Sequence, residues 1–268
     1  MTVEANWKAF CSALKGIQCF ARHRFEKVIQ TTSTNDDLKS DWKFLPPPPR
    51  LLVAEHQTGG RGQFDRTWYD SPGKSLLFSF SWKCSDEELI SIPHSLVMGV
   101  AVHRALTESM EKDHKIWLKW PNDIFIEEKK ICGILMESVN KGSDFFLVIG
   151  VGINVLEAPG EKNLNAGTLD TGAPMEKTLE RILKQWEMCL NMSSEELLNE
   201  FRRRSYPFWR GQCSLDLPGG QSVRVTPDDV DRCGRLICTD LEGNRRRVSS
   251  ANQIHFFPAE QKQKEKGG

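Results

Sequence analysis

The chain has 268 residues, enough for one large domain or for a large and a small one. Its 36 basic and 36 acidic side chains cancel to a formal net charge of zero, which argues against an overall electrostatic attraction to nucleic acid or to an anionic membrane. No apolar run reaches the length of a membrane span, and no secretory signal is evident at the N-terminus. The 8 cysteines show no CxxC spacing, which favours buried free thiols in a reducing compartment over a disulfide or zinc framework.

Helical and strand-like patterns alternate through the first half of the chain. Apolar residues recur at helical spacing over residues 3–21, and the stretch VIQTTSTNDDL that follows predicts a short strand running into a helix start. Apolar strands are expected at about 50–56 and 75–82. Residues 92–110 form the strongest helical pattern, with a proline near its start.

The second half continues with hairpins and then with helices. KIWLKW alternates as a strand, IFIEEKKICGILME predicts a hairpin around a charged turn, and residues 145–155 predict a further strand. Helices are expected at 178–192 and 194–204. Because several strands come as hairpins, the main sheet should be mixed or antiparallel rather than doubly wound.

The pattern changes after residue 205, which predicts a domain boundary. Residues 1–205 form the expected α+β domain, a mixed sheet flanked by helices. Residues 206–258 contain short β runs separated by Gly, Pro and Asp, which suit a small β-barrel of about fifty residues. The polar composition of residues 259–268 predicts a disordered tail.

The glycine-rich segment at residues 57–68 is the first candidate site. Its glycines allow close backbone approach to a ligand, Arg61 and Arg66 supply forked cationic donors for carboxylate or phosphate, and Trp68 supplies a flat apolar surface. The segment matches neither the Walker phosphate-binding loop nor the dinucleotide fingerprint. The pattern fits a loop that closes over an anionic, partly apolar ligand, and it also fits a surface turn with solvated arginines.

Two further candidates lie in the hairpin region. In KWPND, residues 119–123, the Asn122 amide and the Asp123 carboxylate project from a strand end, where they suit the polar edges of a nucleotide or a phosphate-held metal. A plain strand-ending turn gives the same pattern. Lys130 follows the charged turn of the next hairpin, and by itself it also fits a solvated turn lysine.

A series of motifs, rather than any one of them, carries a family resemblance. In chain order they are STN at 33–35, QTGGRG at 57–62, W-x-x-SPG at 68–73, KWPND at 119–123, KxxGIL at 130–135 and IGVGIN at 149–154. This series resembles the biotin–protein ligase (holocarboxylase synthetase) family over about residues 28–257. The pair KWPND and KxxGIL is its most specific part, whereas the glycine-rich segment alone is not specific.

The resemblance implies a fold and an activity. The fold is the class II synthetase-like catalytic domain of biotin–lipoate ligases, followed by a small SH3-like β-barrel. The activity is ATP-dependent: biotin and ATP, with Mg²⁺ through undefined ligands, give biotinyl-5′-AMP, and biotin then passes to a lysine of a biotin carboxyl carrier domain. Some bacterial members carry a DNA-binding domain before the STN motif, but too little sequence precedes it here. We therefore expect a monofunctional cytoplasmic ligase that binds neither nucleic acid nor membrane, of undefined oligomeric state.

The resemblance also implies the site residues. The expected catalytic residues are Lys130 and Arg61, which join the biotin carboxylate to the α-phosphate, and Asp123, which attracts the incoming lysine. The expected biotin-binding residues are Ser33, Thr34, Asn35, Gln57, Arg61, Gly62, Gln63, Trp68 and Lys130. The expected residues for ATP and the adenylate are Arg61, Arg66, Trp68, Asn122, Asp123, Lys130, Gly150, Gly152 and Asn154.

Several of these residues have a structural alternative. The polar residues at 33–35 also fit a helix cap, and Gln57 also fits a strand-end amide. Trp68 also suits core filler, and Gly150 and Gly152 also fit a β-bulge.

One position departs from the family, and three other functions compete. Many members have Arg where this chain has Gln63, so the resemblance implies slower adenylation, with Arg66 as the replacement cation. A lipoate–protein ligase would share the fold and the adenylate chemistry. A non-catalytic carrier-binding module would not need Lys130, Arg61 and Asp123. An interaction protein led by the small barrel would bind its partner without residues 1–205.

Overall fold

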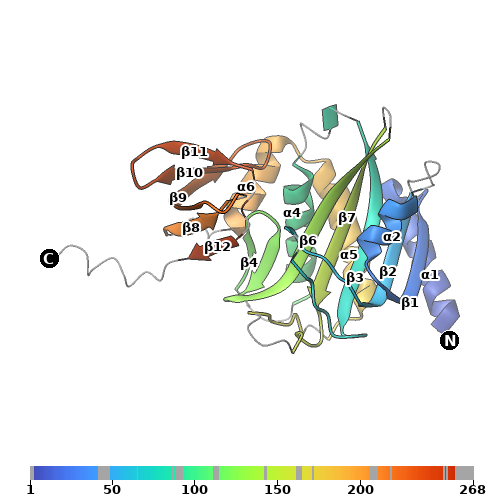
Figure 1. The fold of residues 1–268 in the computed structure, drawn as a ribbon. Coiled ribbons are helices and arrows are strands. Elements are labelled where there is room, and N and C mark those ends of the chain that lie inside the picture. The colour runs from blue at the N-terminus through green and yellow to red at the C-terminus, as the bar shows by residue number, and fades with distance from the viewer. Residues whose placement is uncertain are drawn as a thin grey trace.

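A computed structural model of the chain describes residues 3–41, 49–64, 66–85, 87–88, 93–110, 115–141, 144–160, 165–170, 172–205, 211–217, 219–249, 251 and 253–256. In these residues a large sheet with helices forms the main body, and a smaller sheet packs at one end of it (Figure 1). We call the smaller sheet the C-terminal module. None of the helices within these ranges is long and apolar enough to cross a membrane.

The main sheet has seven strands in the order β1-β2-β3-β7-β6-β5-β4. The strands are β1 (Arg24–Thr31), β2 (Arg50–Gln57), β3 (Ser75–Cys84), β4 (Ile116–Lys119), β5 (Asp123–Ile126), β6 (Lys129–Lys141) and β7 (Asp144–Asn154). Only β1 and β2 pair in parallel; the other neighbours within the described residues are antiparallel. The predicted mixed sheet flanked by helices is confirmed.

Helices cover both faces of this sheet (Figure 1). The described helices are α1 (Val3–Lys15), η1 (Gln18–Phe20), α2 (Thr34–Asp41), α4 (His94–Thr107), α5 (Met175–Leu190) and α6 (Ser194–Arg204). Successive side chains of β2 point to opposite faces of the sheet, so they identify which helices cover each face. Leu51 and Val53 join the main core with α4 and α5, whereas Leu52 packs with Leu38 of α2. Among the described helices, α2 is therefore the one that packs on the face that carries the site described below.

The C-terminal module is a five-stranded antiparallel sheet in the order β11-β10-β9-β8-β12. Its strands are β8 (Cys213–Asp216), β9 (Ser222–Val230), β10 (Leu236–Asp240), β11 (Arg245–Val248) and β12 (Gln253–Phe256). This small sheet fits the expected SH3-like fold, although no ladder joins its edge strands β11 and β12 in the described part of the chain. The expected boundary at residue 206 and the tail at 259–268 lie outside the described residues.

Most predicted elements occur where the pattern placed them, with shifted ends. The helix expected over 3–21 is interrupted: α1 ends at Lys15, and a 3-10 turn follows Gly16, because glycine is a poor helix residue. The helix expected at 194–204 is confirmed, with a complete capping box between Ser193 and Glu196. The cysteines are free thiols; five are buried as expected (Cys84, Cys132, Cys189, Cys213 and Cys238), whereas Cys11 and Cys19 are partly exposed and Cys233 is exposed.

A buried histidine makes the stability of the main body depend on pH. His103 of α4 is 4% exposed, and its Nδ1 accepts a hydrogen bond from Arg204 at 3.0 Å. Burial and the charge of Arg204 lower the pKa of His103 to about 4. As the pH falls below about 6.5, the histidine of the unfolded chain binds a proton, whereas His103 of the folded protein stays neutral until about pH 4. The free energy of unfolding is therefore highest above pH 6.5 and decreases as the pH falls.

We expect the free energy of unfolding to fall by about 2 kcal/mol between pH 8 and pH 5 through His103 alone. Urea titration at each pH measures this loss. His103→Gln has no proton to bind and should lose that part of the slope. His23, whose pKa burial also lowers to about 4, remains in the variant as an internal reference. Equal slopes in the two proteins would contradict the assignment.

Candidate active site

The site is a pocket of about 600 Å³ over the α2 face of the sheet. The glycine-rich segment, the end of β4 and the strands β6 and β7 all contribute to its wall. Every site residue expected from the sequence lines this one pocket: Ser33, Thr34, Asn35, Gln57, Arg61, Gly62, Gln63, Arg66, Trp68, Asn122, Asp123, Lys130, Gly150, Gly152 and Asn154. The fold thus brings the separate motifs together.

One end of the pocket is built from the N-terminus of α2. The Asp36 amide donates to Ser33 Oγ at 3.4 Å, and the Thr34 amide donates to Gln57 Oε1 at 2.8 Å. Ser33, Thr34 and Asn35 are buried at 2%, 4% and 3% exposure. All three residues line the pocket, and Ser33 also caps the helix, so capping and a place in the pocket are compatible for this motif.

The glycines of β7 make room for side chains of the protein itself. A Cβ on Gly152 would lie 2.6 Å from Cε2 of Trp68, and one on Gly150 would lie 2.2 Å from Oδ1 of Asn35. Both glycines sit in regular β3–β7 and β6–β7 pairing, so the β-bulge alternative is wrong. Trp68 lines the pocket over Gly152, rather than filling the core. In this structure Asn35 and Trp68, not open space for a nucleotide, lie directly above the two glycines.

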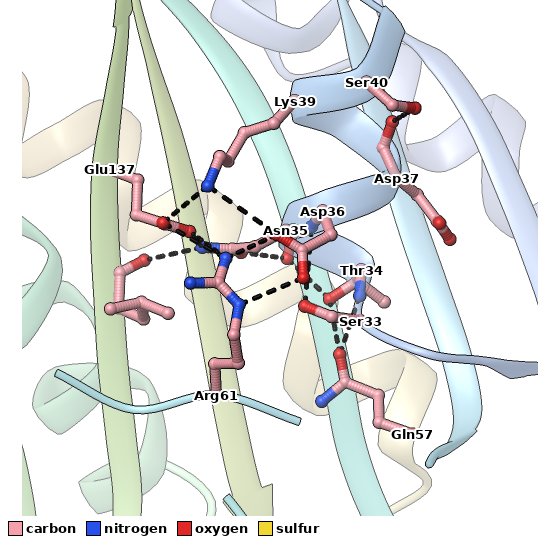
Figure 2. Close-up of polar contacts among 12 residues, drawn as sticks. Ser33, Thr34, Asn35, Asp36, Asp37, Lys39, Ser40, Gln57, Arg61 and Glu137 are labelled. Atoms are coloured by element: carbon pink, nitrogen blue, oxygen red, sulfur yellow. Dashed lines mark hydrogen bonds and ion pairs between the residues drawn. The ribbon is translucent and has the colours of Figure 1, made fainter. Parts of the chain in front are cut away.

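The Arg61 guanidinium points to two carboxylates (Figure 2). It donates to Asp36 through Nε at 3.0 Å and Nη2 at 2.6 Å, and to Glu137 through Nη2 at 2.8 Å. Burial alone would raise the pKa of Glu137, but hydrogen bonds from Lys39, Asn35 and Arg61 together hold it below its usual value. The sequence predicted Arg61 as a cation facing two ligand anions; in this structure its charge is already balanced by protein carboxylates.

Lys130 is the cation at the centre of the pocket. Its Nζ lies 2.6 Å from Asp123 Oδ1 and 5.6 Å from the centre of the Trp68 ring. Lys119, on the next strand but one, lies deeper: its Nζ donates to the Ile254 carbonyl of β12 at 3.1 Å, and burial lowers its pKa. The reactive region therefore has one accessible lysine held by a carboxylate, with a second cation behind it.

Three polar atoms of the pocket wall are buried without a hydrogen-bond partner. They are Gln63 Oε1, Trp68 Nε1 and Asn154 Oδ1. The Asn154 amide nitrogen donates to the Gly167 carbonyl at 3.2 Å, so only its oxygen is left. Since buried polar groups are normally paired, the unpaired acceptors and donor indicate a polar ligand. The Arg66 side chain is exposed, and its Nε donates to the Gln63 carbonyl at 3.2 Å.

Sequence reasoning missed three residues that the structure adds to the site. Glu137 of β6 and Asp36 of α2 hold Arg61, and Ser79 of β3 contacts Thr34 and Asn35. A weak signal existed for Glu137, which is the carboxylate of its strand and follows KxxGIL after one residue, Met136. Ser79 carried no signal of its own, because a serine in an apolar strand is common.

Comparison with known proteins agrees with this geometry. The model of the biotin/lipoate A/B protein ligase family matches residues 27–154. The biotin–[acetyl-CoA-carboxylase] ligase of Mycobacterium tuberculosis is 32% identical over 243 residues, which cover 87% of this chain and 89% of that protein. The fold and the pocket thus define an enzyme of the adenylate-forming ligase type.

Solved structures give the same result. The biotin protein ligase from Aquifex aeolicus in complex with biotin and ATP is similar with a TM-score of 0.71 and 25% identity, over 87% of this chain and 99% of that one. The biotin protein ligase from Leishmania major in complex with biotinyl-5-AMP has a TM-score of 0.59 and 25% identity, over 85% and 99%. The chain belongs to the biotin/lipoate A/B protein ligase family, on its biotin protein ligase side.

Proposed function

We propose that this protein is a biotin protein ligase that activates biotin with ATP and transfers it to a lysine of a biotin carboxyl carrier domain. The observation that carries the proposal is the single pocket that joins the STN end, with its buried hydroxyls and amides, to Lys130 and Asp123. One end suits the polar ring of biotin, and the other suits the junction of a carboxylate and a phosphate.

The chemistry has two steps. A carboxylate oxygen of biotin attacks the α-phosphorus of ATP, a P–O bond forms, and pyrophosphate leaves with the electron pair of the broken P–O bond. The carrier lysine, as a free amine, then attacks the acyl carbon, loses a proton, and AMP leaves. In the first step two anions meet, so a cation at the junction lowers the barrier. Lys130 is that cation, and Asp123 orients its ammonium group.

The remaining residues of the pocket bind the rest of the ligand. Ser33, Thr34, Asn35 and Gln57 face the ring of biotin, and the backbone of Gly62 and Gln63 closes the glycine-rich segment over the acyl phosphate. The adenylate is assigned to the wall formed by Arg66, Trp68, Asn122, Asp123 and Asn154, whereas Gly150 and Gly152 act by making room for Asn35 and Trp68. Arg61 acts by fixing this segment to α2 and β6, which the ion pairs with Asp36 and Glu137 support.

Mg²⁺ is assigned to the nucleotide rather than to a protein cage. No cluster of three or more His, Cys, Asp or Glu side chains suited to a metal occurs in the described residues. Asp123 is the carboxylate that lines the described pocket. This fits Mg²⁺, which is usually held by one or two carboxylates together with substrate phosphates and water. When bound, it neutralises phosphate charge.

The division of the chain and its location complete the proposal. Residues 1–205 form the catalytic domain, residues 206–258 form the SH3-like domain, and residues 259–268 form a tail. The free cysteines support a reducing, cytoplasmic location. The balanced net charge supports a carrier protein, rather than nucleic acid, as the partner.

Pyrophosphate release from ATP and Mg²⁺ tests the proposal, with biotin, lipoate or octanoate as the acid. We expect release with biotin alone. Release with lipoate or octanoate would keep the adenylate mechanism and replace the substrate. Absence of release with any acid would favour a non-catalytic carrier-binding module. Gln63→Arg in the same assay then shows whether the missing cation at that position limits the rate.

A further inference from the structure

Glu137 of β6 is the point where three donors meet, two from α2 and one from the glycine-rich segment. Its carboxylate accepts from Asn35 Nδ2 at 2.9 Å, from Lys39 Nζ at 2.7 Å and from Arg61 Nη2 at 2.8 Å. Asp36 takes the second face of Arg61 and lies 3.6 Å from Lys39 Nζ. Figure 2 shows this cluster between β6 and α2. Its two carboxylates and two cations balance, so Glu137 adds no net charge to the pocket.

This carboxylate decides which way the Asn35 amide faces. An ionised carboxylate only accepts hydrogen bonds, and the Leu135 carbonyl, 3.4 Å from Asn35 Nδ2, also only accepts. The group that faces them must therefore be the NH₂. The Asn35 carbonyl oxygen is then directed to the other side, above Gly150, where a Cβ would lie 2.2 Å away.

The donor-to-acceptor order of the hydrogen bonds continues through the hydroxyl groups of Ser79 and Thr34. Ser79 Oγ donates to Asn35 Oδ1 at 2.6 Å. Ser79 has one hydroxyl hydrogen, so at its 2.6 Å contact with the Thr34 hydroxyl the donor must be Thr34. The Thr34 hydroxyl also lies 3.0 Å from Gln57 Oε1, and it cannot donate its single hydrogen there while it donates to Ser79. Gln57 Oε1 accepts from the Thr34 amide at 2.8 Å, which leaves the Gln57 NH₂ as a donor.

We propose that Glu137 is a positioning residue that sets the donor and acceptor pattern with which the pocket reads the cyclic urea of biotin. The inference rests on the proposed function. With the chain polarised from Thr34 through Ser79 to Asn35, the pocket offers an acceptor at Asn35 Oδ1 and a donor at Gln57 Nε2. The urea of biotin has the complementary groups, N–H donors and one carbonyl acceptor. We call this hydrogen-bonded chain from Glu137 to Thr34 the polar relay.

A neutral amide in place of Glu137 should remove this control. In Glu137→Gln the new NH₂ can face Asn35, so the Asn35 amide can turn over and present a donor where the urea also has donors. Such a mismatch of buried polar groups weakens binding by about tenfold or more. Glu137 also accepts from Arg61, but Asp36 still holds the Arg61 guanidinium in this variant through two hydrogen bonds, so the KM for ATP should stay within about twofold.

The experiment measures the Kd of biotin by calorimetry, together with kcat and the KM values for biotin and ATP. The variants are Glu137→Gln, Ser79→Ala, the double variant and Asp36→Asn. Asp36→Asn is the matched control, because it removes the other carboxylate from Arg61 and leaves Asn35 bonded to Glu137. Melting temperatures establish that each variant is folded.

We expect both single relay variants to raise the Kd of biotin by about tenfold, and the double variant to be no weaker than the weaker single one, since both break one chain. Asp36→Asn should change the Kd by less than about threefold. Equal losses in Asp36→Asn and Glu137→Gln would overturn the relay in favour of a tether through Arg61. Multiplying losses in the double variant would also overturn it. If the unaltered protein binds no biotin, the proposed function itself fails, whereas wild-type binding with an unchanged Glu137→Gln refutes the relay alone.

Discussion

Replacing Lys130 with alanine should lower kcat/KM for adenylate formation by a factor of about 10²–10³ and leave the fold intact. Removal of one donor that stabilises developing negative charge typically costs this much in rate. The effect has two parts here. The cation at the junction of carboxylate and phosphate is lost, and Asp123, which lies 2.6 Å from Lys130 Nζ, is left as an uncompensated negative charge where two anions must meet.

Two variants separate these parts. Lys130→Ala combined with Asp123→Asn removes the uncompensated carboxylate, and we expect it to recover less than about a tenth of the lost rate, because the cation is still absent. Lys129→Ala is the matched control: it is the neighbouring residue of β6 and does not line the described pocket. Its rate should stay within about twofold of the unaltered protein. Pyrophosphate release that is near normal in Lys130→Ala would remove Lys130 from the catalytic role.

The composition of the pocket was predictable because its motifs are local. Glycines before Arg61 and a lysine after a charged turn are visible in a few consecutive residues, and the order of the motifs identified the family. Their arrangement depends on the sheet order β3-β7-β6, which places Ser79 opposite Gly150 and Gly150 opposite Leu135. The sequence separates Asn35 from Glu137 by 102 positions, so no local pattern could pair them.

The partner of Arg61 also could not be predicted from local sequence. A forked cation in a glycine-rich segment suits an anionic ligand as well as it suits a protein carboxylate. Local sequence contains nothing that separates the two. Only the register of β6 brings Glu137 within 2.8 Å of Arg61 Nη2, and this contact is the basis for proposing that Arg61 supports the segment.

The KWPND motif also joins the two parts of the molecule. Lys119 donates to the Ile254 carbonyl at 3.1 Å, and Trp120 Nε1 donates to the Gly234 carbonyl at 2.9 Å. Trp120 is 1% exposed. Ile254 and Ala251 of the C-terminal module line the pocket. Lys119 and Trp120 therefore fix the position of the C-terminal module, whose residues Ala251 and Ile254 line the same pocket as Asn122 and Asp123.

We expect Trp120→Phe to lower the free energy of unfolding by about 2–3 kcal/mol and to raise the KM for ATP several-fold. The smaller ring leaves a cavity in the core, and the Gly234 carbonyl loses its donor in a buried place. The Gly234 backbone has a φ of +78°, and a Cβ at this position would lie 3.0 Å from Pro93 Cβ and 3.4 Å from Leu96 Cγ at the start of α4, so this turn has few ways to relax. Urea titration and steady-state kinetics measure the two effects.

Trp117→Phe is the matched control for this joint. Trp117 lies on the same strand, and its Nε1 also donates to a backbone carbonyl, that of Glu127 within the main sheet at 2.5 Å. It does not line the described pocket, so its loss should cost less than about 1 kcal/mol of stability, as for a partly exposed hydrogen bond, and should leave the KM for ATP unchanged. Equal kinetic effects of the two substitutions would mean that the C-terminal module does not shape the pocket. A rise in the KM for ATP confined to Trp120→Phe would support a role of the C-terminal module in the nucleotide site, because Trp120 donates to the Gly234 carbonyl of the module, whereas Trp117 donates to a carbonyl of the main body.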